Sequence, residues 1–162
     1  MRPRTHANID GDLIVSFGDV IFKRYILDVL MEPVADFVIA VDTNWSASVN
    51  RDRAADYVRC SEPHSRHAFY HDVTLEAAGE DLADDQIHGE WIGVLRASAE
   101  GLPVLRTLVG ELVEKPDNRG AKLHHLLDEL VRRGHAVRVV YTTGHWLDVD
   151  SLDDVLAAGS FA

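Results

Sequence analysis

Apolar residues in the first quarter of the chain fall into short, strand-sized runs. Residues 13–17 read LIVSF and are followed, after Gly18 and Asp19, by VIF at 20–22. A β-branched apolar run that ends at Gly-Asp is typical of a buried strand that enters a loop. Residues 36–42, DFVIAVD, form a second run of this kind. Runs that are apolar on both faces predict strands of a parallel sheet covered by helices on each side.

The stretch between these two runs has the period of a helix. Tyr25, Ile26, Val29 and Leu30 share one helical face, and Pro33 ends the pattern. The order strand, helix, strand predicts a βαβ unit, whose crossover should be right-handed.

The rest of the chain continues this alternation. Gly134 is expected at the C′ position of one helix, and Ser151 is expected as the N-cap of the last. These patterns predict an α/β fold with a mainly parallel, mixed sheet, helices on both faces and one antiparallel excursion. The remaining predicted elements are strands at 57–60, 68–76, 89–98 and 135–141, helices at 99–114, 123–133 and 151–158, a turn at 116–118, and loops at 43–55 and 144–150.

Composition narrows the choice of partners. The 162 residues fit one domain, 1–162, and 16 basic against 27 acidic residues give a net charge of -11. A negative field of this size repels nucleic acid and anionic lipid surfaces, so neither is an expected partner. The apolar runs are far shorter than the roughly 20 residues that span a bilayer. The single cysteine, Cys60, excludes an internal disulfide. A cytoplasmic protein is therefore expected.

Three aspartates are the strongest candidates for chemistry. Asp19 follows a predicted buried strand, and Asp148 and Asp150 follow the predicted strand at 135–141. Ligands of open α/β sheets bind in the crevice at the carboxyl ends of strands, so neighbouring strands would bring these carboxylates together. Such a cluster of hard oxygen ligands suits Mg²⁺. The alternative is that Asp19 caps a turn and that Asp148 and Asp150 are solvated.

Histidines give weaker signals. His64, His67 and His71 would align as a zinc-binding face on a helix, but Pro63 and the strand-like sequence that follows favour solvated residues in a loop and strand. His145 adjoins the acidic motif and is a candidate phosphate contact, with loop packing as the alternative.

Other side chains also have both a functional and a structural interpretation. His124 and His125 point to different helix faces, so at most one of them is expected to be functional. Trp45 and Trp91 fit either a pocket or the core. Cys60 fits a small buried hydrophobe.

Four motifs together resemble one known superfamily. They read SFGDVIFKRYIL at 16–27, DFVIAVD at 36–42, GEWIGVLRAS at 89–98 and RGHAVRVVYTTGHWLDVDSLDDV at 133–155. They are similar to the sugar nucleotidyltransferases, which have a nucleotide-diphospho-sugar transferase fold. The order and spacing look most like cytidylyltransferase-type members fused to phosphoenolpyruvate phosphomutase in phosphonate biosynthesis.

The resemblance implies roles for individual residues. Asp19 and Asp150 match the family's Mg²⁺ ligands, and Asp148 stands where relatives often have Glu. The implied reaction is attack of a phosphonate or phosphate acceptor on the α-phosphorus of CTP, in which positioning and charge neutralisation do most of the work. Acceptor-binding residues would be Glu90, Trp91 and Gly93, and candidate phosphate contacts are Lys23, Arg24, Lys122 and His145.

One departure from the family is large. Its first half carries a Gly-rich loop that cradles the triphosphate, whereas only 18 residues precede Asp19 here and the sequence has no such loop. We therefore expect a domain truncated in its N-terminal half, which is either a C-terminal part of a larger protein or a remnant without nucleotide binding. The alternative functions are a docking or oligomerisation domain, with a phosphomutase domain or a second copy as partner, and a metal- or anion-binding module.

Overall fold

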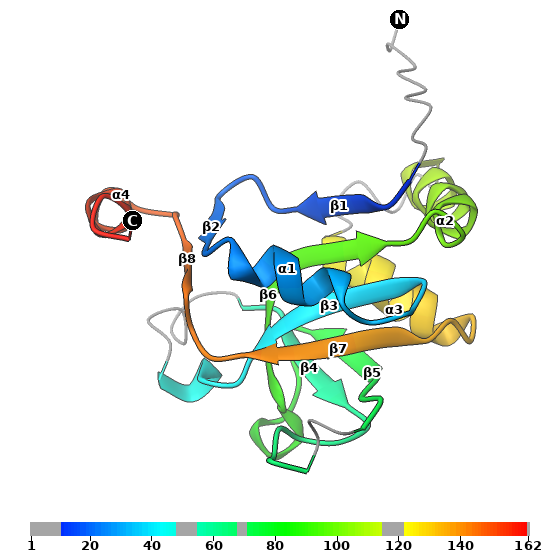
Figure 1. The fold of residues 1–162 in the computed structure, drawn as a ribbon, viewed down its shortest axis with the longest axis horizontal. Coiled ribbons are helices and arrows are strands. Elements are labelled where there is room, and N and C mark those ends of the chain that lie inside the picture. The colour runs from blue at the N-terminus through cyan, green and yellow to red at the C-terminus, as the bar shows by residue number, and fades with distance from the viewer. Residues whose placement is uncertain (1–10, 48–54, 68–70, 115–121, 162) are drawn as a thin grey trace, which may run out of the picture.

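A six-stranded mixed sheet and a separate two-stranded ribbon make up the framework of the molecule (Figure 1). The computed structural model describes residues 11–47, 55–67, 71–114 and 122–161. The main sheet has the order β5-β4-β6-β3-β7, with β1 also paired to β6, and the ribbon pairs β2 with β8. The strands are β1 (Leu13–Ser16), β2 (Val20–Phe22), β3 (Phe37–Asp42), β4 (Tyr57–Cys60), β5 (Leu75–Gly79), β6 (Gly89–Ala97), β7 (Val137–Thr142) and β8 (Trp146–Asp148). The helices are α1 (Tyr25–Met31), α2 (Leu102–Glu114), α3 (Leu123–Arg132) and α4 (Leu152–Ala158), with short 3₁₀ turns at Trp45–Ala47 and Asp84–Gln86.

The centre of the sheet is more antiparallel than the sequence pattern predicts. β3 and β7 are parallel over six residue pairs, whereas β6 runs antiparallel to β1, β3 and β4. Strands β1 and β3 are therefore parallel to each other, as expected for the predicted βαβ unit, but β6 lies between them. The α/β class and the mixed sheet are confirmed. All six residues of β3 are buried, which explains its continuous apolar sequence.

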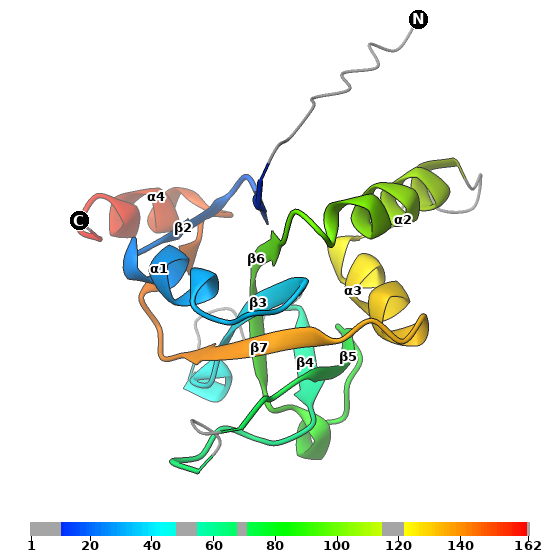
Figure 2. The same cartoon turned by 45° about the vertical axis from the view of Figure 1, so that its right-hand side comes forward.

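Helices cover both faces of the sheet, as predicted. On one face, Ile26 and Leu30 of α1 pack against Val38 and Ile92. On the other face, α2 and α3 lie side by side over the larger part of the core (Figure 2). Gly134 ends α3 with a positive φ of 81°, the left-handed conformation predicted for its C′ position.

A bulge in β6 lets this long strand serve two neighbours. Between the pairs Val41–Trp91 and Ile39–Leu95 the register with β3 shifts, and Gly93 lies in this interval with φ of 75°. A glycine is required here because a Cβ at this position would overlap the ring of Phe17.

The ribbon is the largest difference from the predicted elements. Residues 144–150, predicted as a loop, contain β8, which pairs antiparallel with β2. The ribbon and α4 lie together at the opposite end of the molecule from α2 and α3 (Figures 1 and 2). Strand β5 begins at Leu75, so the strand predicted at 68–76 starts later and runs on to Gly79. The turn predicted at 116–118 lies outside the described residues.

No helix among the described residues is both long enough and apolar enough to cross a bilayer.

Candidate functional site

The ribbon brings together the three aspartates that the sequence singled out. Val20 pairs with Asp148, and the amide of Val149 donates to the carbonyl oxygen of Asp19 at 2.9 Å. Carboxylate oxygens of Asp19, Asp148 and Asp150 lie within 4.8 Å of one another. The carboxylate cluster, as we call these three residues, therefore joins two segments about 130 residues apart. Asp19 and Asp150 are exposed, and Asp148 is half-buried.

A helix cap fixes the third member of the cluster. Ser151 caps α4, as predicted, and its hydroxyl accepts from the amide of Asp154 at 3.2 Å. The buried carboxylate of Asp154 reaches back and accepts from the amides of Ser151 at 2.8 Å and Asp150 at 3.2 Å. Asp154 thus positions Asp150. Sequence reasoning missed it, although the S-x-x-D spacing of a capping box was available as a signal.

A buried carboxylate holds the approach to β8. Asp42, the last residue of β3, is 4% exposed. Its carboxylate accepts from the amide of Asn44 at 2.9 Å, the amide of Gly144 at 3.0 Å and the indole nitrogen of Trp146 at 2.7 Å. These three donors satisfy the buried charge and tie the end of β3 to the start of β8. In the sequence, Asp42 reads only as the end of a strand.

Three of the four candidate phosphate contacts lie at the far end of the ribbon from the carboxylate cluster. The amide of Lys23 donates to the carbonyl oxygen of His145 at 2.9 Å. His145 is three residues before Asp148, which corresponds to roughly 10 Å along a strand. Its Nδ1 lies 3.0 Å from the hydroxyl of Tyr25, and the two rings meet edge to face. Arg24 is nearby as the exposed N-cap of α1.

The side chains of these cations do not converge on the carboxylates. The ammonium of Lys23 bonds the carbonyl oxygen of Phe161 and lies over its ring. Lys122, the fourth candidate, is an exposed residue at the start of α3 and forms an ion pair with Glu80. That pair lowers the pKa of Glu80 and raises the pKa of Lys122 from their usual values, mainly through the hydrogen bond between them.

The three residues implied in acceptor binding lie in β6 and are buried in this structure. Trp91 is 2% exposed, its ring packs on Phe17 at 5.3 Å, and its indole nitrogen donates to the carbonyl oxygen of Val94 at 2.9 Å. Glu90 is 3% exposed, and Gly93 lies under Phe17. Because Phe17 is only two residues before Asp19, Trp91 and Gly93 connect β6 to the loop that carries Asp19.

The other singled-out side chains follow their structural alternatives. His71 lies 2.8 Å from a carboxylate oxygen of Glu62, and His64 packs edge to face on Tyr141. Cys60 is buried in the core, and burial raises the pKa of its thiol to about 11. Trp45 lies in the 3₁₀ turn against Tyr57, with ring centroids 5.6 Å apart.

The donor chemistry of the carboxylate cluster fits a hard divalent cation. It offers only carboxylate oxygens, which are the preferred ligands of Mg²⁺ and Mn²⁺. Three negative charges within 4.8 Å repel one another, and a bound cation would relieve this repulsion. Its exposed position also leaves room for ligand oxygens from a substrate.

Comparison with solved structures identifies the fold. The inositol-1-phosphate CTP transferase of T. maritima matches 90% of this chain with a TM-score of 0.63 and 19% sequence identity. A nucleoside-diphosphate-sugar pyrophosphorylase of Vibrio cholerae matches 92% with a TM-score of 0.52 and 12% identity. The chain covers 52% and 57% of these two structures. No protein-family model and no curated protein matches. The chain therefore has a nucleotidyltransferase-like α/β fold that spans about half the length of the structures it resembles.

Proposed function

We propose that this chain is the metal- and acceptor-binding part of a nucleotidyltransferase, acting in Mg²⁺-dependent cytidylyl transfer to a phosphonate or phosphate acceptor. The observation that carries the proposal is the convergence of Asp19, Asp148 and Asp150 from the two strands of the ribbon. The similarity in fold to a CTP transferase supports nucleotidyl transfer. The link to phosphoenolpyruvate phosphomutase and phosphonate biosynthesis rests on the resemblance of the sequence motifs.

In this proposal, the residues of the chain bind and orient. Asp19, Asp148 and Asp150 hold Mg²⁺, which when bound offsets negative charge on phosphate oxygens. Asp154 and Asp42 keep two of these ligands in place through the cap of α4 and the start of β8.

Acceptor and phosphate contacts complete the proposed site. Glu90, Trp91 and Gly93 shape the acceptor side through Phe17. Lys23 and Arg24 offer positive charge at the other end of the ribbon, where His145 also lies, and Lys122 would have to leave Glu80 to contribute. An acceptor with a second anionic group, long enough to bridge roughly 10 Å, would use both ends of the ribbon.

Calorimetric titration tests this function. We expect CTP or CMP to bind only with Mg²⁺ present, and Mn²⁺ alone to bind at the carboxylate cluster. Asp19→Asn and Asp150→Asn should each weaken Mn²⁺ binding at least tenfold, whereas Asp153→Asn, an exposed acid in the first turn of α4, should not. Unchanged Mn²⁺ and nucleotide binding in both variants would overturn the assignment. A folded protein that ignores millimolar nucleotide would exclude nucleotide transfer by this chain.

A second candidate function is docking, and α4 favours it. Leu152, Val155 and Leu156 lie at i, i+3 and i+4 on this helix and are 76%, 53% and 67% exposed. One apolar face of this kind is typical of a helix that packs against a partner. We propose a second copy of the chain as that partner. Light scattering after size exclusion should show a dimer that Leu156→Glu converts to monomer. A monomer at all concentrations, or a dimer that survives Leu156→Glu, contradicts docking through this face.

A further inference from the structure

A second group of metal-ligating side chains lies far from the ribbon, where β4, β5 and α3 meet. Asp56 directly precedes β4, Glu80 directly follows β5, and His124 lies in the first turn of α3. A ligand atom from each of these three residues lies within 4.8 Å of the other two. We call them the His–carboxylate cluster. They lie 24 and 44 positions apart in the chain, so only the fold brings them together.

The histidine of this cluster is held in place. His124 is 6% exposed, and its Nδ1 lies 2.6 Å from a carboxylate oxygen of Asp56. An ionised carboxylate can only accept, so Nδ1 carries the proton in this contact, and a cation bound by both residues would take the place of that proton.

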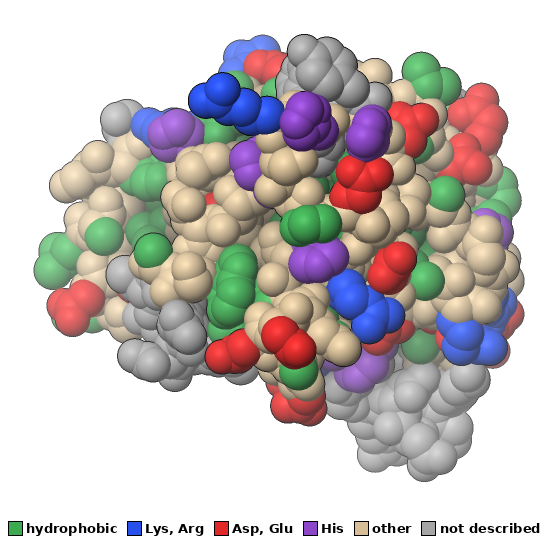
Figure 3. Space-filling model, turned by 90° about the horizontal axis from the view of Figure 1, so that it is seen from below, with side chains coloured by type: hydrophobic (Ala, Val, Ile, Leu, Met, Phe, Trp, Pro, Cys, Tyr) green, Lys and Arg blue, Asp and Glu red, His purple; other side chains and the backbone are tan. Residues whose placement is uncertain are grey.

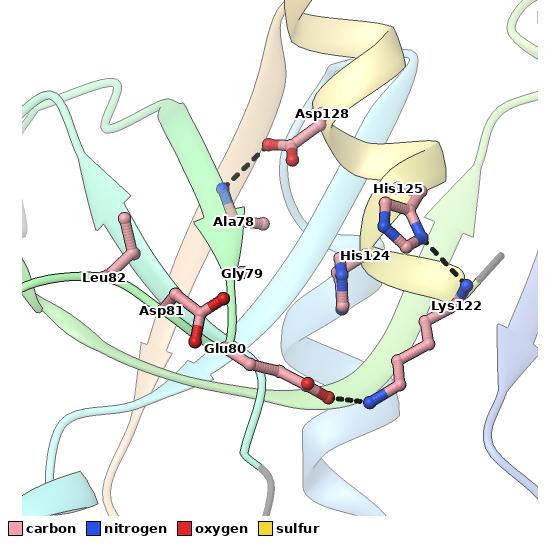
Figure 4. Close-up of a pocket in the computed structure, with 9 residues that line it drawn as sticks. All are labelled: Ala78, Gly79, Glu80, Asp81, Leu82, Lys122, His124, His125 and Asp128. Carbon is pink, nitrogen blue, oxygen red and sulfur yellow. Dashed lines mark hydrogen bonds and ion pairs between the residues drawn. The ribbon is translucent and has the colours of Figure 1, made fainter. Parts of the chain in front are cut away.

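The cluster opens into a pocket of about 410 Å³. Figure 4 shows His124 and Lys122 projecting from the start of α3 towards Glu80. Asp128, about one turn beyond His124 along α3, accepts the amide hydrogen of Ala78 at 2.9 Å. The pocket side of the cluster is lined mainly by charged and histidine side chains.

Neighbouring groups divide into ligands and non-ligands on chemical grounds. Nδ1 of His125 accepts the amide hydrogen of Lys122 at 2.8 Å, and His125 is not part of the group whose ligand atoms converge within 4.8 Å. Lys122 already places a cation on Glu80 through its ion pair. Because the Lys122 side chain is 52% exposed, it can turn into solvent when another cation takes its place.

We propose that Asp56, Glu80 and His124 bind a divalent transition-metal cation of the Zn²⁺ class, with an open coordination position facing the pocket. The imidazole nitrogen favours Zn²⁺ or Co²⁺ over Mg²⁺, which distinguishes this site from the carboxylate cluster. Three protein ligands with a fourth position left open is the arrangement of zinc sites that bind water or substrate. Bound metal also joins β4, β5 and α3, so it stabilises the fold by mass action.

Metal titration of the protein without a polyhistidine tag tests the proposal. Zn²⁺ should bind with one site per chain that survives Asp19→Asn, and Co²⁺ should give the visible absorption of a low-coordinate site. Glu80→Gln should weaken Zn²⁺ binding at least tenfold, and His124→Asn at least a hundredfold. Lys122→Met should strengthen it severalfold by removing the competing ammonium. The matched controls His125→Asn and Asp81→Asn, which also line the pocket, should bind as the parent does.

Glu80→Gln keeps the test decisive if His124→Asn does not fold, because Glu80 is partly exposed. A melting temperature that rises with Zn²⁺ in the parent and not in Glu80→Gln supports the site. Equal Zn²⁺ affinity in the parent and in folded Glu80→Gln overturns it and assigns the binding to surface histidines. A folded parent that binds no Zn²⁺ below millimolar concentration also overturns it.

Discussion

The carboxylate cluster and the His–carboxylate cluster offer cations two different environments. The first consists only of aspartates on a two-stranded ribbon, and two of its three members are exposed. The second combines a buried histidine with two half-buried acids at the edge of the main sheet. Exposed carboxylates suit a hydrated, hard cation, whereas a fixed imidazole suits a softer one. One small fold thus presents two clusters of ligand side chains that differ in both donor type and solvent access.

The two clusters also differ in what holds them. Asp150 donates its amide hydrogen to the carboxylate of Asp154 in α4, and Trp146, two residues before Asp148, donates its indole hydrogen to the carboxylate of Asp42 in β3. The His–carboxylate cluster depends on the packing of α3 against β5 and on the Asp56–His124 contact.

Acidic, basic and histidine side chains are interspersed on the face of the molecule seen in Figure 3, so the net charge of -11 does not form one continuous negative surface there.

We expect the largest loss of stability from removing the Asp42 carboxylate, which supports the ribbon and not the His–carboxylate cluster. Asp42→Ala leaves three part-buried donors without their acceptor, and at about 1 kcal/mol for each of them the free energy of unfolding should fall by about 3 kcal/mol. Urea denaturation measures this loss. Asp42→Asn keeps one oxygen acceptor and should lose less. Mn²⁺ binding should weaken while Zn²⁺ binding remains. A loss below 1 kcal/mol for Asp42→Ala would mean that the three hydrogen bonds of Asp42 contribute little to stability.

Gly93→Ala tests the bulge that connects β6 to the loop of Asp19. The added Cβ overlaps the ring of Phe17, and the positive φ of 75° disfavours any side chain. We expect the free energy of unfolding to fall by about 2–3 kcal/mol. Gly110→Ala is the matched control, because this helical glycine has open space around its Cβ position and should become slightly more stable. Similar stability of the two variants would show that the bulge tolerates a side chain.

Titrating variants of each cluster with both metals tests whether the two clusters bind cations independently. Asp19→Asn with Asp150→Asn should reduce Mn²⁺ affinity at least tenfold, about 1.4 kcal/mol, and leave Zn²⁺ affinity unchanged. Glu80→Gln should do the reverse. Parallel titrations of both metals against both variants measure the crossed effect. If either variant weakens both metals equally, the two clusters do not act as independent sites.

The smallest effect concerns Cys60, the chain's one thiol, which lies at the end of β4, four residues after Asp56. In the folded chain, burial raises the pKa of this thiol from 9.0 to about 11. Above pH 9 the thiol therefore ionises in the unfolded chain but not in the folded chain, and this ionisation stabilises the unfolded state. The free energy of unfolding should therefore fall by about 1 kcal/mol between pH 8 and pH 10. Cys60→Ala should flatten this dependence without changing Zn²⁺ affinity at pH 7.5. An unchanged slope would mean that other groups, such as Tyr141, dominate.

Local patterns predicted the elements that depend on local interactions. The apolar runs at 36–42 and 89–98 correspond to β3 and β6, whose strand interiors are buried. Gly134 and Ser151 were placed correctly as helix-end residues because capping involves only near neighbours. The convergence of Asp19 with Asp148 and Asp150 was anticipated, although through a crevice between strands and not through a ribbon.

Features that depend on distant pairing escaped prediction. Strand β8 is three residues long and shows its strand character only through β2, so its sequence reads as a loop. The bulge at Gly93 depends on two interactions of β6, its pairing with β3 and the packing of Phe17 over Gly93. The His–carboxylate cluster draws on residues 56, 80 and 124, and no spacing rule links them. In the sequence, His124 is only one of two adjacent histidines in a predicted helix.

The pairing of β2 with β8 has a consequence for how the molecule folds. This contact joins segments more than 120 residues apart, so forming it has a large loop-closure entropy cost. We therefore expect it to be among the last contacts to form. With only three residue pairs, the ribbon should open more readily than the main sheet, and its amides should exchange with solvent first. A mutation in the ribbon should therefore speed unfolding and leave the folding rate almost unchanged. The carboxylate cluster would come into existence only at the final step of folding.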